Sequence, residues 1–360
     1  MKLQYKTLII IFLLPVLVLA NHGKFNGKYT KEKTVKKEYT VNSDALLEID
    51  NSYGNVDIIS WNENRTVIEV YIKTNSNDEE KAQKRLDDIT IEFSGSSSIV
   101  SAKTVFKTKK SSWKFWGKDN SVKMEINYII KVPVTNSVNL ENDYGAISLD
   151  KLEGHAKISC DYGQLHIGEL WAENNSLNFD YTNNSTIAFM KSGKIDADYS
   201  GFTLEKGEKL ELNADYTNSE IQDIGDINYN SDYGKVVIGS ADKVVGVGDY
   251  VTNRIGTITG SLDLNTDYGS IKVERLEGSA KNVTIEADYT GVKLGFAPDY
   301  NFNFYIDLSY ASLKGDDDVT VTKSHKDNSR RTYEGYHGNN NSGNTVRINS
   351  DYGGVTFDKN

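Results

Sequence analysis

Apolar and small residues recur in a fixed order around a set of tyrosines from about Leu140 to the C-terminus. Counted from each tyrosine, apolar residues stand at −4, +3 and +5, and a small residue usually stands at −2. Around Tyr268, for example, −4 is Leu264, −2 is Thr266 and +3 is Ile271. Alternation over −4, −2 and 0 predicts a half-buried strand, because successive side chains of a strand point to opposite faces. The odd step from 0 to +3 breaks the alternation, so we expect a corner after each tyrosine and a second strand beyond it.

The tyrosines of this pattern are separated by 17 to 21 residues, and an aspartate precedes each of them. They are Tyr144, Tyr162, Tyr181, Tyr199, Tyr216, Tyr233, Tyr250, Tyr268 and Tyr289, followed after a longer gap by Tyr352. One such unit cannot bury its own apolar face, whereas stacked units form a continuous core. The pattern therefore predicts an all-β chain, a β-solenoid of 17–21-residue coils with roughly ten coils and a length of about 50 Å.

Glycine or a small polar residue follows most of these tyrosines, as at Gly145, Gly163 and Gly269. Glycine allows the positive φ that such a corner can require. Because the tyrosine falls in the inward phase, we expect a stacked tyrosine column that fills the corner of the core, with each hydroxyl reaching solvent or a backbone group. An outward column would instead present an aromatic strip for sugars or other flat ligands.

The aspartate before each tyrosine points the other way, so stacking brings like charges about 5 Å apart at a cost of about 1 kcal/mol per neighbouring pair. One interpretation is that each carboxylate accepts backbone N–H groups at the corner. The other is a divalent cation site, because calcium prefers several carboxylate and carbonyl oxygens. The candidate metal residues are Asp198, Asp215, Asp232, Asp249 and Asp267. The absence of an EF-hand loop and of a glycine-rich calcium nonapeptide argues against this second interpretation. We therefore expect no cofactor, with calcium as the one possible exception.

Residues 21–135 form a separate β-rich region that opens with the same theme around Tyr53, although Ser52 replaces the aspartate. Strands are predicted over residues 66–72, 89–93, 99–106 and 122–132. The charged segment from Ser76 to Asp88 is the one credible helix, with Ser76 and Glu79 offering a capping box.

A lysine-rich aromatic segment at residues 107–117 interrupts this region and is unusual in an acidic protein. Its candidate binding residues are Lys110, Trp113, Lys114, Phe115 and Trp116. They predict either a docking tip for an envelope surface, glycan or protein, or aromatics that fold back over the open end of the core while the lysines stay solvated.

Residues 1–20 have the features of a signal peptide: Lys2 and Lys6 precede an apolar run that ends in Val18-Leu19-Ala20. The run is too short for a comfortable membrane span. Removing the two lysines takes the formal charge from −10 to −12, which argues against nucleic acid as a partner. We expect an exported protein, periplasmic or at the cell surface, with no transmembrane segment after cleavage.

The remainder of the chain, residues 136–360, is expected to be the solenoid, with a polar excursion near residues 315–345 that is either disordered or a binding loop. Ser309-Tyr310 is a degenerate repeat, and residues 348–357 return as a final coil. Cys160, the only cysteine, occupies an inward small-residue position and is expected to be a buried thiol.

Candidate catalytic residues are lacking. The histidines show no zinc-binding spacing, and His155 and His166 are expected to be surface residues. A column of equivalent aspartates is also the wrong pattern for an asymmetric acid/base pair. We therefore expect no catalytic residues and no enzyme, although a carbohydrate-active enzyme on a β-helix and a calcium-stabilised surface protein remain open as alternatives.

The opening segment Leu47-Glu-Ile-Asp-Asn-Ser-Tyr-Gly-Asn-Val-Asp-Ile58, the leader and the repeated Asp-Tyr-Gly units resemble the bacterial exported "putative adhesin" β-solenoid families, which include the autotransporter-adhesin head type. The resemblance covers most of residues 40–360. It implies a non-enzymatic adhesin-like scaffold of the cell envelope, whose partner is an envelope component, a glycan or a protein, and it supplies no catalytic residues.

Overall fold

The computed structural model describes residues 25–107 and 122–360, and over these residues the protein is all-β apart from one α-helix and one short 3-10 helix. The expected leader at residues 1–20 lies outside the described residues, as do the candidate binding residues Lys110, Trp113, Lys114, Phe115 and Trp116. Among the described residues, no helix is long and apolar enough to cross a membrane.

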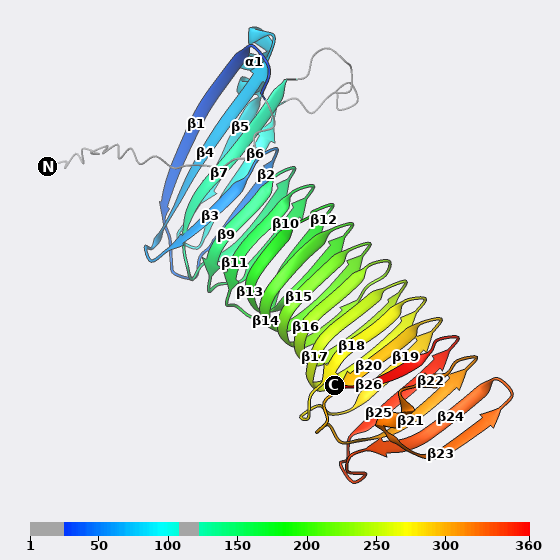
Figure 1. Cartoon of the computed structure of the whole chain (residues 1–360). Coiled ribbons are helices and arrows are strands. Elements are labelled where there is room, and N and C mark those ends of the chain that lie inside the picture. Colours follow the sequence, from blue (N-terminus) through cyan, green and yellow to red (C-terminus); the bar gives the residue numbers. More distant parts are fainter. Residues whose placement is uncertain (1–24, 108–121) are drawn as a thin grey trace.

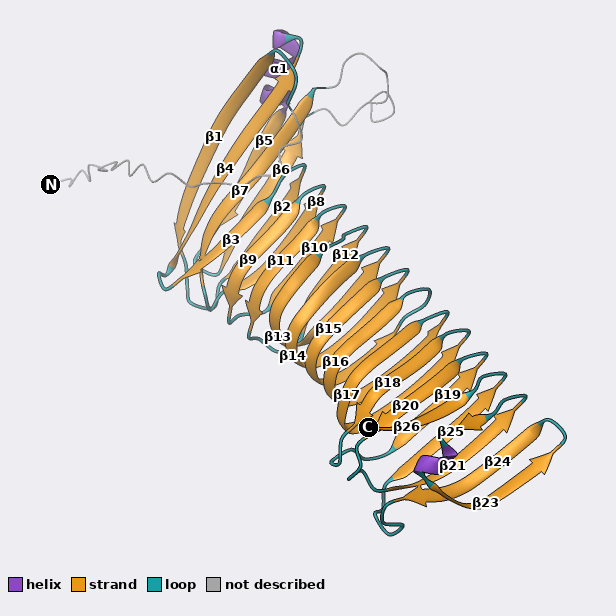
Figure 2. Ribbon diagram, in the orientation of Figure 1, coloured by secondary structure: helices purple, strands orange, loops and turns teal. Residues whose placement is uncertain are grey.

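The strands lie side by side along an elongated body, with the N-terminal region at one end and a hairpin at the other (Figures 1 and 2). The strands of its central part are β8 Ser137–Asp143, β9 Ala146–Leu152, β10 Ala156–Asp161, β11 Gln164–Leu170, β12 Asn175–Asp180, β13 Ser185–Asp198, β14 Gly201–Asp215, β15 Asn218–Asn230, β16 Lys235–Asp249, β17 Thr252–Asp267, β18 Ser270–Leu276, β19 Val283–Asp288 and β20 Gly291–Phe296.

Parallel pairing joins each of these strands to its equivalent one repeat later. Asp198 of β13 pairs with Asp215 of β14, 17 residues on, and Ile195 pairs with Leu212 in the same register. Most of these strands that lead into a repeat tyrosine end at the aspartate just before it; β15, which ends at Asn230, is an exception. The repeat read from the sequence is therefore the unit that pairs.

The N-terminal end of the stack contains both parallel and antiparallel strand pairs. Here β2 pairs in parallel with both β6 and β8, whereas β4 pairs antiparallel with β1 and with β7. The elements are β1 Tyr29–Thr40, β2 Leu46–Ser52, β3 Val56–Trp61, β4 Arg65–Ser76, α1 Glu79–Asp88, β5 Ile89–Gly95, β6 Ile99–Phe106 and β7 Lys123–Pro133. All four strands predicted for this region are present.

The predicted helix is confirmed, but its predicted cap is wrong. Asp78, not Ser76, is the N-cap of α1, and its side chain accepts a hydrogen bond from the backbone N–H of Lys81. Ser76 still belongs to β4, and its hydroxyl accepts from the N–H of Asp78 at 3.2 Å. The strand extends further than its apolar pattern suggests, which moves the helix start by two residues.

The C-terminal end departs from chain order. Strand β25 lies between β19 and β21, and β26 lies between β20 and β22, so the last coil of the chain is inserted next to last in the stack. The expectation of a final coil is wrong in position. The elements are β21 Phe302–Ser309, β22 Leu313–Lys314, η2 Asp316–Asp318, β23 Thr320–Asp327, β24 Arg330–His337, β25 Thr345–Asp351 and β26 Val355–Lys359.

The polar excursion predicted near residues 315–345 is largely ordered. Its strands β23 and β24 form an antiparallel hairpin, and β24 also pairs antiparallel with β21, which covers the last coil. Every residue of β23 is exposed, so this strand has no buried face and gave no alternating apolar pattern to predict it.

One core cluster runs through the described residues from Val41 to Phe357. It crosses residue 135 without a break, because β2 and β3 pair directly with β8 and β9. The predicted division at 135/136 stays a prediction, but the two regions share hydrogen bonds and core.

Candidate functional site

The repeat tyrosines form one continuous column of stacked rings, the tyrosine ladder. Neighbouring ring centroids lie 4.7 to 5.2 Å apart, and interplanar angles are 1 to 10°. In spatial order the ladder is Tyr53, Tyr144, Tyr162, Tyr181, Tyr199, Tyr216, Tyr233, Tyr250, Tyr268, Tyr289, Tyr352 and Tyr310. The stacking was predicted, and Tyr310, read as a degenerate repeat, is a full member.

The predicted burial of these tyrosines is wrong. Their side chains are 41 to 65% exposed, with most near 50%. Each has a positive φ, between 50 and 66°, so the backbone turns at the tyrosine itself and its side chain leaves the alternation of the preceding strand. A non-glycine residue in this conformation costs about 1 kcal/mol, and stacking of each aromatic pair returns about 0.5–1.5 kcal/mol. The ladder therefore lies on the outside of the corner.

The glycines after the tyrosines serve close approach and not positive φ. A Cβ at Gly163 would lie 2.0 Å from the carbonyl oxygen of Gly145, and one at Gly269 would lie 2.2 Å from that of Val251. Neither glycine has a positive φ. The absence of a side chain lets adjacent coils come within strand-pairing distance at the corner.

Positions −2 and +1 share the inside of each corner, and the residue types at the two positions vary together. Where glycine follows the tyrosine, position −2 is Asn, Cys, Ser or Thr; where a larger residue follows, −2 is apolar or glycine. The first kind comprises Asn51/Gly54, Asn142/Gly145, Cys160/Gly163, Ser231/Gly234, Thr266/Gly269 and Ser350/Gly353; the second comprises Phe179/Thr182, Ala197/Ser200, Ala214/Thr217, Gly248/Val251, Ala287/Thr290 and Leu308/Ala311.

Both arrangements bring a hydroxyl to the same place. The Thr217 Oγ1 at +1 donates to the carbonyl oxygen of Ala197 at 2.9 Å, and the Ser231 Oγ at −2 donates to that of Ala214 at 2.6 Å. Each acceptor is the −2 carbonyl of the preceding coil. The polar group can come from either side because both positions face the same interior corner.

Stacking leaves ring edges and hydroxyls, not ring faces, available along the ladder. Each inner tyrosine has a parallel neighbour on both sides. At the N-terminal end, Phe106 packs edge-on against Tyr53 at 6.2 Å and 83°. At the other end Tyr310 stacks only on Tyr352 and is 65% exposed, the highest value in the ladder. The described residues thus leave one ring face of the ladder open.

The aspartates before the tyrosines form a second column, the aspartate ladder. The Oδ1 of Asp215 accepts from the backbone N–H of Asp232 at 3.0 Å, and the Oδ1 of Asp232 accepts from that of Asp249 at 2.8 Å. Asp161, Asp180 and Asp198 accept in the same way at 3.2 to 3.3 Å. Backbone N–H groups thus offset the repulsion between these carboxylates, as one of the two interpretations predicted.

Like charges and partial burial still affect titration. Burial raises the pKa of Asp180, and the neighbouring carboxylates of Asp161 and Asp198 add to the rise. Burial likewise raises the pKa of Asp143 and of Asp267, again with neighbouring aspartates contributing.

The candidate metal residues Asp198, Asp215, Asp232, Asp249 and Asp267 all stand in this ladder. Within the described residues, no group of three or more His, Cys, Asp or Glu side chains has a geometry that could hold a metal ion. A shallow hollow of about 270 Å³ lies beside Asp180, Asp198 and Asp215, and is completed by amide side chains such as Asn213, whose Nδ2 donates to Asp196 at 2.7 Å. Calcium binding stays a prediction.

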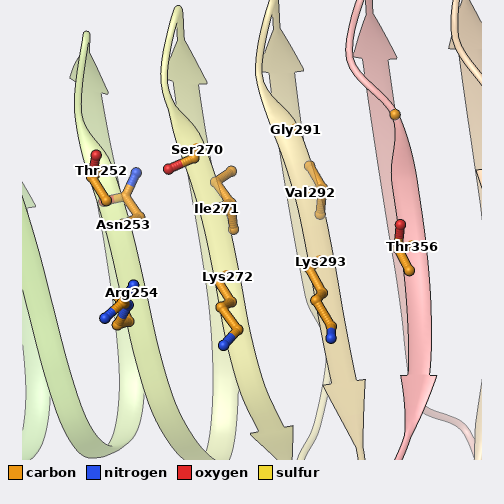
Figure 3. A pocket seen from close by; sticks show the side chains of 11 residues that line it. Thr252, Asn253, Arg254, Ser270, Ile271, Lys272, Gly291, Val292, Lys293 and Thr356 are labelled. Carbon is orange, nitrogen blue, oxygen red and sulfur yellow. The ribbon is translucent and has the colours of Figure 1, made fainter.

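A basic hollow of about 380 Å³ lies on the strands that follow the tyrosines (Figure 3). Arg254, Lys272 and Lys293 stand in register on neighbouring strands. Two of these charges are compensated, because Lys272 pairs with Glu274 at 2.5 Å and Lys293 with Asp358 at 2.6 Å.

Cys160 and the two histidines are where the sequence predicted them. Cys160 is fully buried, and this burial raises the pKa of its thiol to about 12, which keeps it protonated at neutral pH. His155 and His166 are exposed.

The comparisons with known proteins return solved structures only. No protein-family profile matches the chain, and no curated protein does. Among solved structures it is similar to a putative cell adhesion protein of Clostridium sporogenes, with 9% identity over 92% of this chain and 100% of that one, and a TM-score of 0.21.

A putative adhesin of Bacteroides fragilis is 11% identical over 91% of this chain and 97% of that one, with a TM-score of 0.28. A putative lipid binding protein of Parabacteroides distasonis is 9% identical over 90% and 96%, with a TM-score of 0.30. The adhesin descriptions match the family that the sequence resembles. At these TM-scores the likenesses carry no argument about function, which rests on the chain's own geometry.

Proposed function

We propose that this chain is a non-enzymatic, exported, adhesin-like scaffold that binds a linear glycan of the cell envelope along its tyrosine ladder. The ladder itself carries the proposal: twelve half-exposed tyrosines stacked at 4.7 to 5.2 Å. The scaffold is a β-solenoid, supported by parallel pairing between successive repeats. The leader at residues 1–20 supports export to the periplasm or cell surface.

A repeated surface suits a repeated ligand. Each coil from Tyr144 to Tyr352 offers the same elements at the same place: a tyrosine hydroxyl and edge, and beside it an aspartate that is 17 residues from the next in the central coils. A contact that is weak in one coil gains affinity when a linked ligand makes it again in the next coil, because the later contacts are intramolecular. A short ligand would gain little from the other coils.

Edge and hydroxyl contacts favour hydrogen bonding over stacking. The rings cover one another's faces, so a sugar cannot lie flat on an inner tyrosine. The phenolic hydroxyl donates and accepts hydrogen bonds, and the ionised aspartate accepts them. Together they match the hydroxyl groups that a glycan chain repeats along its length.

The test is the dependence of affinity on ligand length. Fluorescently labelled oligosaccharides from size-fractionated envelope glycan, from two to about ten sugars, would be titrated against the full chain and followed by anisotropy. We expect affinity to rise steeply with length until the oligosaccharide spans the ladder. Equal affinity for short and long oligosaccharides would overturn the proposal.

Two variants separate the hydroxyls from the rings. Replacing Tyr199, Tyr216 and Tyr233 by Phe keeps the stack and removes three hydroxyls, and replacing them by Asn removes the rings with a residue that tolerates positive φ. We expect both triple variants to weaken binding of the longest oligosaccharide at least 10-fold. The control is Tyr71→Phe, which removes the hydroxyl of an exposed tyrosine outside the ladder. An unchanged affinity in the folded Phe variant would contradict the role of the hydroxyls.

A further inference from the structure

The free end of the tyrosine ladder borders an open, shallow surface cavity of about 480 Å³. It lies between the last coil and the turn of the β23–β24 hairpin, and it is lined by Tyr310, Ala311, Ser312, Lys326, Asn328, Ser329, Arg331 and Gly354. The volume falls within the range of small-molecule sites. The cavity is separate from the ladder edge described above.

The open ring face exists because the last coil is incomplete. Its second strand, β22, has only two residues, so no further coil is built on Tyr310. The backbone N–H of Tyr310 donates to Ser329 of the hairpin turn at 3.0 Å, which fixes the hairpin beside the ring without covering it. Tyr310 is therefore held by its stack on Tyr352 and by the hairpin while one face stays exposed.

Two cations face each other at this cavity. Lys326 and Arg331 are direct cross-strand partners in the β23–β24 hairpin. Like charges in such a pair are destabilising, and no carboxylate lines the cavity. The nearby Arg330 differs, because its guanidinium makes a bidentate pair with Asp307. In an acidic protein, two opposed cations beside an open ring indicate a place for an anion.

The remaining lining residues indicate the rest of the ligand. Ser312, Asn328 and Ser329 are small polar side chains that donate and accept hydrogen bonds. An aromatic acid would leave them without partners, whereas a sugar ring carries several hydroxyls. The open face of Tyr310 supplies the flat apolar contact.

We propose that this cavity binds an acidic sugar, a pyranose ring that carries a carboxylate, with the ring on Tyr310 and the carboxylate between Lys326 and Arg331. The proposal does not depend on glycan binding along the ladder. It requires only that the open face and the opposed cations act on one ligand.

The experiment uses the full chain and D-glucuronate as the probe, followed by ligand-observed NMR and isothermal titration. D-glucose is the neutral match, and inorganic phosphate is the anion without a ring. We expect glucuronate to bind at least 10-fold more tightly than either, and its affinity to fall with added salt. Equal binding of glucose would overturn the role of the cations, and equal binding of phosphate would overturn the role of the ring.

Variants localise the site. Lys326→Gln with Arg331→Gln, and separately Tyr310→Asn, are each expected to weaken glucuronate binding at least 10-fold. Tyr216→Asn, which removes a ring from the middle of the ladder, should leave it unchanged. Unaltered binding in both site variants, with folding confirmed by circular dichroism, would overturn the proposal. Loss of length-dependent glycan binding in the Tyr199, Tyr216 and Tyr233 variants would leave glucuronate binding intact, so the two proposals fail separately.

Discussion

The two ends of the tyrosine ladder are built on opposite principles. At the N-terminal end, the interior of the corner is polar: the Asn51 Nδ2 donates to the carbonyl of Ile126 and to Asn142 Oδ1, each at 3.0 Å, and Thr104 donates to the Asn51 Oδ1 at 2.9 Å. At the C-terminal end, the same interior positions hold the apolar Leu308 and Ala311.

The two ends of the ladder also differ on the outside of the corner. Phe106 closes the last ring face at the N-terminal end, where the stack continues into an antiparallel sheet and a helix. Tyr310 leaves its face open at the other end. The polar network ties the first coil to a neighbouring structure, whereas the apolar corner finishes a coil that nothing follows. A few residues thus decide whether an end of the stack joins further structure or offers an exposed surface.

The largest change in stability is expected when the polar side chain of Asn51 is replaced by an apolar one. Asn51→Leu leaves the carbonyl of Ile126 and the side chains of Asn142 and Thr104 short of partners in a fully buried site, and each lost partner costs about 1–3 kcal/mol. We expect a loss of about 3 kcal/mol in the free energy of unfolding, measured by urea denaturation. The reciprocal change, Leu308→Asn, should also destabilise, because no partner awaits the amide. A loss below about 1 kcal/mol for Asn51→Leu would contradict the network.

Two adjacent glycines near the open end sharpen the comparison. A Cβ at Gly353 would lie 2.0 Å from the carbonyl oxygen of Thr290 in the coil below, whereas at Gly354 the nearest atom is 3.7 Å away. We expect Gly353→Ala to cost about 2 kcal/mol through overpacking, and Gly354→Ala to be close to neutral. The measurement is thermal unfolding of the two variants side by side. Equal losses would show that the open end is packed like the interior.

The two ends should respond to pH in opposite directions. Burial raises the pKa of Asp143 near the N-terminal end, so the folded state binds a proton more readily than the unfolded chain, and this group adds stability as pH falls from neutral through its raised pKa. The Arg330 guanidinium lowers the pKa of Asp307, whose contribution is present at neutral pH and is lost as pH falls through that lowered value.

The corresponding variants test these signs. Asp143→Asn should stabilise the protein at pH 7, and the gain should shrink as pH approaches about 4, the ordinary carboxyl pKa. Asp307→Asn should destabilise at pH 7, with the loss shrinking only at lower pH. The measurement is urea unfolding between pH 3 and pH 8, and shifts of the same sign would refute the difference between the ends.

The smallest effect is expected from calcium. The Oδ1 atoms of the aspartate ladder already accept hydrogen bonds from backbone N–H groups, so we expect the same unfolding temperature in EDTA and in millimolar calcium. A rise in calcium that disappears when Asp215, Asp232 and Asp249 are changed to Asn would instead make the ladder a cation site.

Much of the stack could be predicted from the sequence, because buried positions alternate and recur. The phase around Tyr268, the corner after it and the inward Cys160 all follow from that pattern. The outward orientation of the tyrosines could not be predicted from that pattern, because an apolar residue in phase with a strand is expected to be buried. A positive φ at the tyrosine itself is what turns its side chain outward. The sequence pattern instead favours a positive φ at the glycine that follows.

The complementarity between positions −2 and +1 was available in the sequence and was missed. Asn142 with Gly145, set against Ala214 with Thr217, would have shown that both positions share one interior space. The open end could not be predicted in the same way. It depends on the place of the last coil, and chain order gives no sign that residues 345–359 precede Tyr310 in space.

That inserted coil constrains how the molecule is assembled. Most coils can be added to the stack in the order in which the chain is synthesised or exported, each on the edge left by the one before. Strands β21 and β22 have no such edge until β25 and β26 arrive, since those strands separate them from β19 and β20. Residues 345–359 follow β21 and β22 in the chain but separate them from the earlier coils in the stack, so the order of stacking differs from the order of the chain. The end with the open tyrosine therefore requires β25, on which β21 pairs, and Tyr352, on which Tyr310 stacks.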